Sequence, residues 1–188
     1  MSSSSNPDSD EYDNGSLSGR TATKPSEGVL LLNRQRGQRA DWGEVRGFLD
    51  LLSARMAAPG FTVCLVSDAT IRRYNRQFRG HDKPTDVLSF PTEETGGALG
   101  SSYLGDILIS AETARQNASR FGLRLEEEVK LLALHGVLHL MGHDHEQDNG
   151  EMARLERDWS RRLGLPQTLT GRSRTSSRGR IRSREGRQ

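Results

Sequence analysis

Four of the chain's five histidines lie within residues 135–145. His135 and His139 are four residues apart, so on a helix their imidazoles lie on one face, about 6 Å apart at Cβ. Gly142 follows, and glycine readily adopts the left-handed conformation that ends a helix and turns the chain back. Such a turn can bring His145 toward the first two rings. The run therefore predicts three imidazole donors around a single metal ion.

Three protein ligands with one open position are typical of catalytic zinc, whereas structural zinc usually has four protein ligands. We expect one zinc ion per chain, although three imidazoles also suit copper or nickel. His143 is expected to face solvent rather than the metal. Asp144 is expected either to hydrogen-bond a ligand imidazole or to be an exposed turn residue.

The spacing of the three histidines also occurs in metzincin peptidases. Those enzymes have a glutamate general base directly after the first histidine. This chain has Gly136 at that position. Glycine cannot accept a proton, so the sequence lacks the base of a metzincin-type mechanism and disfavours proteolysis.

The elements that position these residues alternate between strands and helices. Ser110 and either Ser67 or Asp68 are expected to cap helices, and Asp41 with Glu44 forms a capping-box pattern. The expected strands are 29–32, 61–66, 86–90 and 104–109, and the expected helices are 41–55, 68–77, 110–121, 125–140 and 149–163. The third and fourth strands are expected to pair as in a hairpin. This order predicts an α/β (mixed α+β) fold with a sheet of about four strands packed with about five helices.

The chain is expected to form one domain, residues 28–165, between two polar tails. Residues 1–27 are rich in Ser, Asp and Gly, and residues 166–188 hold seven arginines against Glu185 alone. Neither tail has enough apolar residues to offset the entropy of ordering, so both are expected to be disordered. The arginine-rich tail is expected either to add salt-sensitive affinity for phosphates or to be a dispensable extension.

The composition indicates the cellular compartment in which this domain is expected. Cys64 is the only cysteine, which fits a reducing compartment, and its apolar surroundings predict a buried packing residue. No apolar stretch approaches the ~20 residues needed to cross a bilayer, and the N-terminus has no secretory signal pattern. We therefore expect a cytoplasmic protein with no membrane partner.

Two further blocks accompany the histidine run. The first is Asn75 to Arg79 followed by Pro84-Thr85-Asp86-Val87-Leu88-Ser89-Phe90-Pro91, and the second is Leu104-Gly105-Asp106-Ile107. Together with His135-Gly136-Val137-Leu138-His139-Leu140-Met141-Gly142-His143-Asp144-His145, they match in order the motifs of the YbeY family. On these blocks, residues 28–165 resemble that family of bacterial endoribonucleases.

The resemblance implies a zinc-dependent endoribonuclease that prefers single-stranded RNA. It implies action in 3′-end maturation of small-subunit ribosomal RNA and in ribosome quality control, with the small subunit or its proteins as partners. Arg79 matches the family's functional arginine, and a guanidinium suits the charge that develops on phosphate. Asp86 and Asp106 are expected to brace loops or to contact a ligand imidazole. The alternative hypothesis is an RNA-binding ribosome-assembly factor with a structural zinc.

Overall fold

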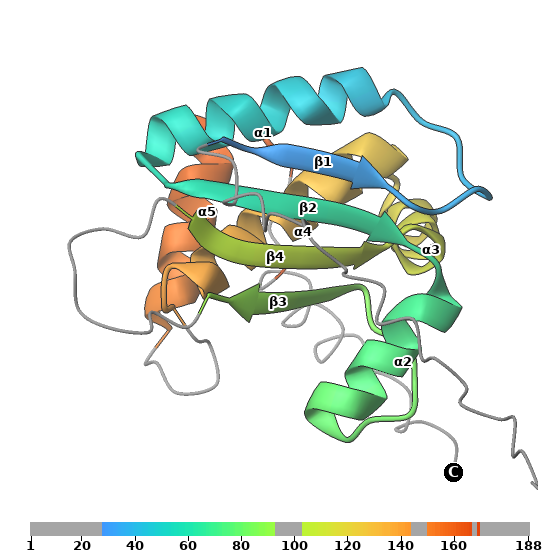
Figure 1. Cartoon of the computed structure of the whole chain (residues 1–188). Helices are drawn as coiled ribbons and strands as arrows, with labels where there is room; N and C mark the ends of the chain where they lie inside the picture. The colour runs from blue at the N-terminus through green and yellow to red at the C-terminus, as the bar shows by residue number, and fades with distance from the viewer. Residues whose placement is uncertain (1–27, 93–102, 144–149, 167–168, 170–188) are drawn as a thin grey trace, which may run out of the picture.

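The computed structural model of the chain describes residues 28–92, 103–143, 150–166 and 169, and its sheet is the predicted mixed sheet (Figure 1). Within these ranges the strands are β1 (Leu30–Asn33), β2 (Gly60–Val66), β3 (Val87–Pro91) and β4 (Tyr103–Ser110). The helices are α1 (Trp42–Met56), α2 (Asp68–Arg79), α3 (Ala111–Phe121), α4 (Leu125–Leu140) and α5 (Glu151–Arg162). The predicted number and order of elements are confirmed, and the α4 bounds coincide with the expected ones.

The sheet has the order β1-β2-β4-β3. Strands β1, β2 and β4 run parallel, and β3 runs antiparallel to β4, from the pair Val87 and Ile109 to the pair Pro91 and Gly105. The expected hairpin-like pairing of the third and fourth strands is therefore confirmed. Among the described strands, β3 therefore lies at an edge of the sheet and pairs with β4.

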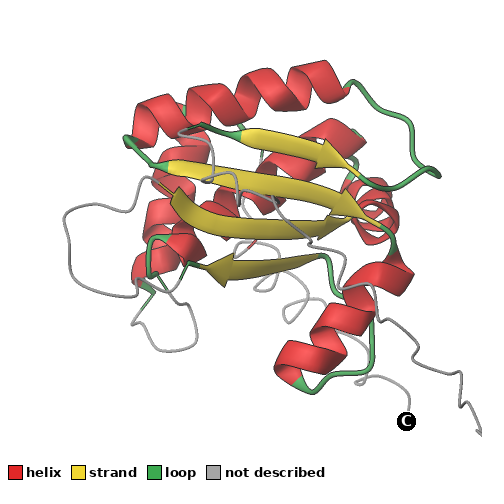
Figure 2. Ribbon diagram, viewed as in Figure 1, coloured by secondary structure: helices red, strands yellow, loops and turns green. Residues whose placement is uncertain are grey.

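The two faces of the sheet have different covers. Successive side chains of a strand point to opposite faces, so Ile107 and Ile109 of β4 lie on one face and Asp106 and Leu108 on the other. Ile107 and Ile109 are fully buried in the main core, to which α1, α3, α4 and α5 contribute. Of the helices, only α2 packs on the opposite face, which Figure 2 shows turned toward the viewer. We call these the α4 face and the α2 face.

Helix α4 is the innermost helix and is therefore a rigid support for functional side chains. Most of its residues are buried, among them Leu131, Leu134 and Leu138. Burial of an aliphatic side chain contributes about 1.5–3 kcal/mol, so this helix is held mainly by packing. No helix in the described ranges is long and apolar enough to cross a membrane.

The start of α1 shows how sequence signals and tertiary contacts compete. As predicted, the Asp41 carboxylate caps the helix by accepting a 3.0 Å hydrogen bond from the Glu44 N–H. The Glu44 carboxylate does not close the capping box. It binds Arg124 and Lys130, which lowers its pKa from 4.5 to about 2. The Asp41 N–H instead donates to Glu126 of α4 at 2.8 Å.

Three apolar side chains of β1 and β2 are partly open to solvent. Leu30 and Leu32 of β1 are 38% and 37% exposed, so this apolar strand is less buried than its composition suggests. Cys64, paired in register with Leu32, is half-buried, and this burial raises the pKa of its thiol. All three side chains lie on the α2 face, which α2 covers at one end only. An apolar run in the sequence does not show on which face of a strand no helix packs.

Candidate metal centre

His135 and His139 lie one turn apart on α4, and their imidazoles converge as the spacing predicts. Their Nε2 atoms are 3.2 Å apart, and their rings meet edge to face with centroids 4.7 Å apart. Both side chains are only partly buried on a helix whose other residues are mostly in the core. The pair is therefore held firmly while remaining open to solvent.

Glu156 of α5 orients the first imidazole. Its Oε2 lies 3.3 Å from Nδ1 of His135, and the carboxylate is almost completely buried. A carboxylate only accepts hydrogen bonds, so Nδ1 is the donor, and in the tautomer that this contact favours Nε2 is the nitrogen left to bind a metal. The other carboxylate oxygen accepts a hydrogen bond from the Leu169 N–H. This arrangement, a metal-binding histidine backed by a carboxylate, is common in metal sites.

Sequence analysis did not identify Glu156. Its partner His135 is 21 residues away, on a helix whose packing against α5 only the fold defines. The one available signal is that Glu156 lies on the buried side of a highly charged helix, together with Met152 and Ser160. A buried acid on such a face calls for a specific partner.

The pair of imidazoles fits a zinc ion. Zn–N bonds of 2.0–2.1 Å at a tetrahedral angle place two ligand nitrogens about 3.3 Å apart. The 3.2 Å between the Nε2 atoms of His135 and His139 agrees with this value. No group of three or more His, Cys, Asp or Glu donors that could hold a metal occurs in the described part of the chain.

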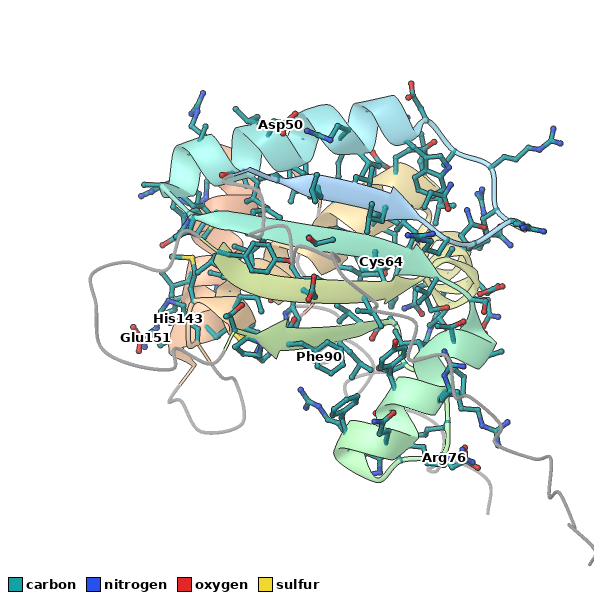
Figure 3. All side chains as sticks on the ribbon, viewed as in Figure 1. Asp50, Cys64, Arg76, Phe90, His143 and Glu151 are labelled. Atoms are coloured by element: carbon teal, nitrogen blue, oxygen red, sulfur yellow. The ribbon has the colours of Figure 1, made fainter. Side chains whose placement is uncertain are left out.

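The end of α4 has the predicted turn. Gly142 adopts φ +90°, and the His143 N–H donates to the Leu138 carbonyl at 3.0 Å, which ends the helix in a Schellman motif. His143 is partly exposed and lies next to this turn (Figure 3). The predicted third ligand, His145, and its neighbour Asp144 lie outside the described residues. Their contribution stays a prediction.

Gly136, between the two histidines, lies directly against the sheet. A Cβ at this position would lie 2.8 Å from Cγ2 of Ile107, which is fully buried on β4. The Gly136 carbonyl accepts a 3.3 Å hydrogen bond from the Ser89 hydroxyl of β3. In metzincins this position carries the glutamate general base. Here the sheet occupies the space that a side chain would need, which agrees with the argument against proteolysis.

Arg79, the predicted phosphate-binding residue, lies on a different element from the histidine pair. It is exposed in the last turn of α2, the helix that packs on the α2 face. The structure therefore brings His135 and His139 together on α4 and places Arg79 on another helix.

Polar side chains of α2 and of the segment before β3 brace the chain. Asn75 is buried and donates from Nδ2 to the Lys83 carbonyl at 2.8 Å, which fixes the loop after α2. Asp86 accepts a 2.9 Å hydrogen bond from the Val87 N–H and a 3.4 Å one from Asn117. The expectation that Asp86 braces a loop is therefore confirmed.

Asp106 has a different environment from the one expected of a residue near the metal. It is exposed on the α2 face and accepts a 2.6 Å hydrogen bond from the Tyr103 hydroxyl, whose oxygen in turn lies 2.7 Å from the Thr62 hydroxyl and accepts a hydrogen bond from it. Partial burial and the hydrogen bond to Asp106 raise the pKa of Tyr103 to about 12. Asp106 therefore points away from the face that carries the imidazoles.

Comparison with known proteins gives a consistent result. The family model Endoribonuclease YbeY matches residues 45–164, within the predicted domain 28–165. Endoribonuclease YbeY of Helicobacter pylori strain J99 is 46% identical over 145 residues, which are 77% of this chain and 98% of the relative. Endoribonuclease YbeY of Solibacter usitatus is 50% identical over 109 residues, which are 58% of this chain and 69% of the relative.

The fold has a counterpart among solved structures. The solution structure of TM1509 from Thermotoga maritima matches with a TM-score of 0.50 and 27% sequence identity. The match covers 83% of this chain and 99% of that protein. With the family model and the curated relatives, it shows that the chain belongs to the YbeY family and is an endoribonuclease.

Proposed function

We propose that this endoribonuclease uses one zinc ion, held by His135, His139 and His145, to hydrolyse single-stranded RNA. Membership of the family implies metal dependence and a function in ribosomal RNA maturation. The finer assignment to the 3′ end of small-subunit ribosomal RNA, with the small subunit or its proteins as partners, is part of the proposal. So are the cytoplasmic location and the domain boundaries 28 and 165.

One observation carries the zinc proposal. The Nε2 atoms of His135 and His139 face each other at 3.2 Å, the separation expected of two nitrogens on one zinc. Glu156 holds the opposite nitrogen of His135, so the lone pair of that ring is directed toward the same point. Gly142 adopts the left-handed conformation of a helix-ending turn, and His145 follows it in the sequence at the spacing expected of a third ligand.

Each residue of the site has a separate function in this proposal. His135, His139 and His145 would hold the zinc ion, which would supply a Lewis acid and make water at the site acidic enough to react near neutral pH. Glu156 keeps His135 in the tautomer that can bind metal. Arg79 binds a phosphate of the RNA and offsets the charge that develops on it, since a guanidinium stays ionised and donates paired hydrogen bonds. Gly136 keeps α4 against the sheet and so fixes the two rings.

The test compares cleavage of a labelled single-stranded RNA and the same RNA in a duplex. We expect the single strand to be cut preferentially. Treatment with a chelator is expected to stop cleavage, and addition of stoichiometric zinc to restore it. Equal cleavage after complete removal of metal would contradict the zinc proposal, and equal cleavage of the duplex would contradict the preference for single strands.

A further inference from the structure

We propose that Tyr74, Phe78 and Phe90 form a base-stacking surface for single-stranded RNA, with phosphates bound by neighbouring cationic side chains. We call these three residues the aromatic surface. The inference rests on the endoribonuclease function, and it assigns substrate binding to the α2 face, opposite the face that carries the histidines.

The three rings form one continuous cluster. Tyr74 and Phe78 lie one turn apart on α2 and are nearly parallel, with centroids 6.1 Å apart and planes inclined by 8°. Phe90 of β3 contacts both rings edge to face, at 5.2 Å from Phe78 and 6.1 Å from Tyr74. Tyr74 and Phe90 are anchored against the small core cluster beneath α2, so the surface is rigid.

Phe78 is exposed to an extent that its packing does not require. Its exposed fraction is 57%, the highest of the large hydrophobic residues in the described ranges. The residues of α2 that the fold buries are Ile71 and Asn75. A phenylalanine on the outer side of a charged helix costs solubility and adds little to the core. A ring presented in this way is well placed to stack on another planar group.

The charged residues around the aromatic surface indicate which kind of ligand binds there. Residues 68–84 carry five cationic side chains against two carboxylates. One of the carboxylates, Asp82, forms a bidentate ion pair with Arg72. The remaining cationic side chains are all exposed: Arg73, Arg76, Arg79 and Lys83. Aromatic rings between exposed cations are the pattern of single-strand binding, where bases stack and phosphates are neutralised.

The edge strand β3 connects this surface to the metal centre. Phe90 contacts α2 on one face, whereas its neighbour Ser89 hydrogen-bonds to Gly136 of α4, between the two histidines, on the other. Among the strands that the structure describes, β3 is the last one at this side of the sheet. A single strand crossing this edge would contact the aromatic surface and the imidazoles in succession. A duplex is too wide and stiff for such a path.

Asp106 sets the orientation of the bound strand. It lies on the α2 face, paired in register with Phe90. A carboxylate there repels phosphate and accepts hydrogen bonds from base amino groups. The bases are therefore expected over Phe90, and the phosphates toward the arginines of α2.

The experiment measures binding separately from cleavage. Fluorescence anisotropy is recorded with the intact metal-loaded protein and a single-stranded oligodeoxynucleotide, which a ribonuclease does not cut, and with an abasic oligodeoxynucleotide of equal length. We expect Phe78→Ala to weaken binding of the first about 10-fold and to leave binding of the second unchanged. Phe78→Tyr should bind as the wild type does. Leu51→Ala, which removes a side chain 41% exposed on α1, is the matched control and should have no effect.

The result that would overturn the inference is equal binding by wild type and Phe78→Ala, or an equal loss for both oligonucleotides. Cleavage kinetics give a second readout: Phe78→Ala should raise the KM for single-stranded RNA about 10-fold with little change in kcat and no change in zinc content. A wild-type protein that binds the oligonucleotide but cleaves no RNA would contradict the proposed function alone. A wild-type protein that cleaves RNA with no dependence on Phe78 would contradict this inference alone.

Discussion

The two faces of the sheet carry functional side chains in opposite ways. On the α4 face the histidine pair lies on a helix embedded in the main core, and each support is buried: Ile107 beneath Gly136, and Glu156 behind His135. On the α2 face the aromatic and basic side chains stand on a short charged helix and are mostly exposed. On the α4 face, the function depends on the precise positions of buried side chains. On the α2 face, it depends on which chemical groups the exposed side chains offer to a ligand.

This difference predicts different phenotypes for the two faces. Substitutions on the α4 face should alter metal binding or stability, because each functional residue is also a packing residue. Substitutions on the α2 face should alter RNA binding and cleavage while leaving the metal and the fold intact. Four substitutions, two of functional residues and two of supporting contacts, distinguish these phenotypes.

Arg79→Ala tests the α2 face. We expect cleavage of single-stranded RNA to fall about 100-fold or more, because a fixed cation beside a developing phosphate charge is lost. Zinc content and melting temperature should not change, since the side chain is exposed. Arg55→Ala, in the corresponding last turn of α1, is the control. Loss of zinc from Arg79→Ala would contradict the expectation that substitutions on the α2 face leave metal binding unchanged.

Glu156→Gln tests the support behind the metal ligand. We expect zinc affinity to fall about 10- to 100-fold, because the amide holds the ring of His135 less firmly than a carboxylate does. Competition with a chromophoric chelator measures the affinity. Glu151→Gln, at the exposed start of the same helix, should bind zinc as the wild type does. Unchanged affinity in Glu156→Gln would show that the hydrogen bond does not orient the ligand.

Gly136→Ala tests the contact between α4 and the sheet. The new methyl would lie 2.8 Å from Cγ2 of the buried Ile107 side chain. Overpacking costs about 1–3 kcal/mol, against a gain in helix propensity of up to about 1 kcal/mol. Urea unfolding should therefore show a net loss of about 1–2 kcal/mol. Gly47→Ala on α1, which has no atoms within 4 Å of the added methyl, should be neutral or stabilising.

Glu44→Gln is expected to have the smallest effect, and one that depends on pH. Arg124 and Lys130 lower the pKa of Glu44 from 4.5 to about 2 in the folded protein. Their stabilisation is therefore complete above the unfolded pKa and lost as the pH falls from about 4.5 to about 2. Ion pairs this close to the surface contribute only weakly to stability. The melting temperatures of the two proteins should differ at pH 7 and converge near pH 2.

Much of the fold was predictable because local signals and tertiary contacts agree. The bounds of α4, the caps at Ser67 and Ser110 and the antiparallel pairing of β3 all follow from the sequence pattern. The imidazole pair followed from helix geometry alone. The predicted capping box was wrong because a distant partner competes for the carboxylate. Glu44 binds Lys130 of α4 instead of the Asp41 N–H at the start of its own helix.

The remaining features depend on which face of the sheet is covered. The exposure of Leu30 and Leu32 reflects the uncovered end of the α2 face, which an apolar run cannot report. Glu156 and His135 meet only because α5 packs against α4. The aromatic surface likewise joins α2 to β3, and no local pattern in the sequence links Phe78 to Phe90.

The central claim is that the α4 face binds zinc through its imidazoles. Elemental analysis of purified wild type, His139→Ala and His81→Ala tests it most directly, because His81 is an exposed histidine outside the run. We predict about one zinc per chain in the wild type and in His81→Ala, and almost none in His139→Ala. Equal zinc in all three proteins, or a folded wild type that takes up no zinc, would contradict the account.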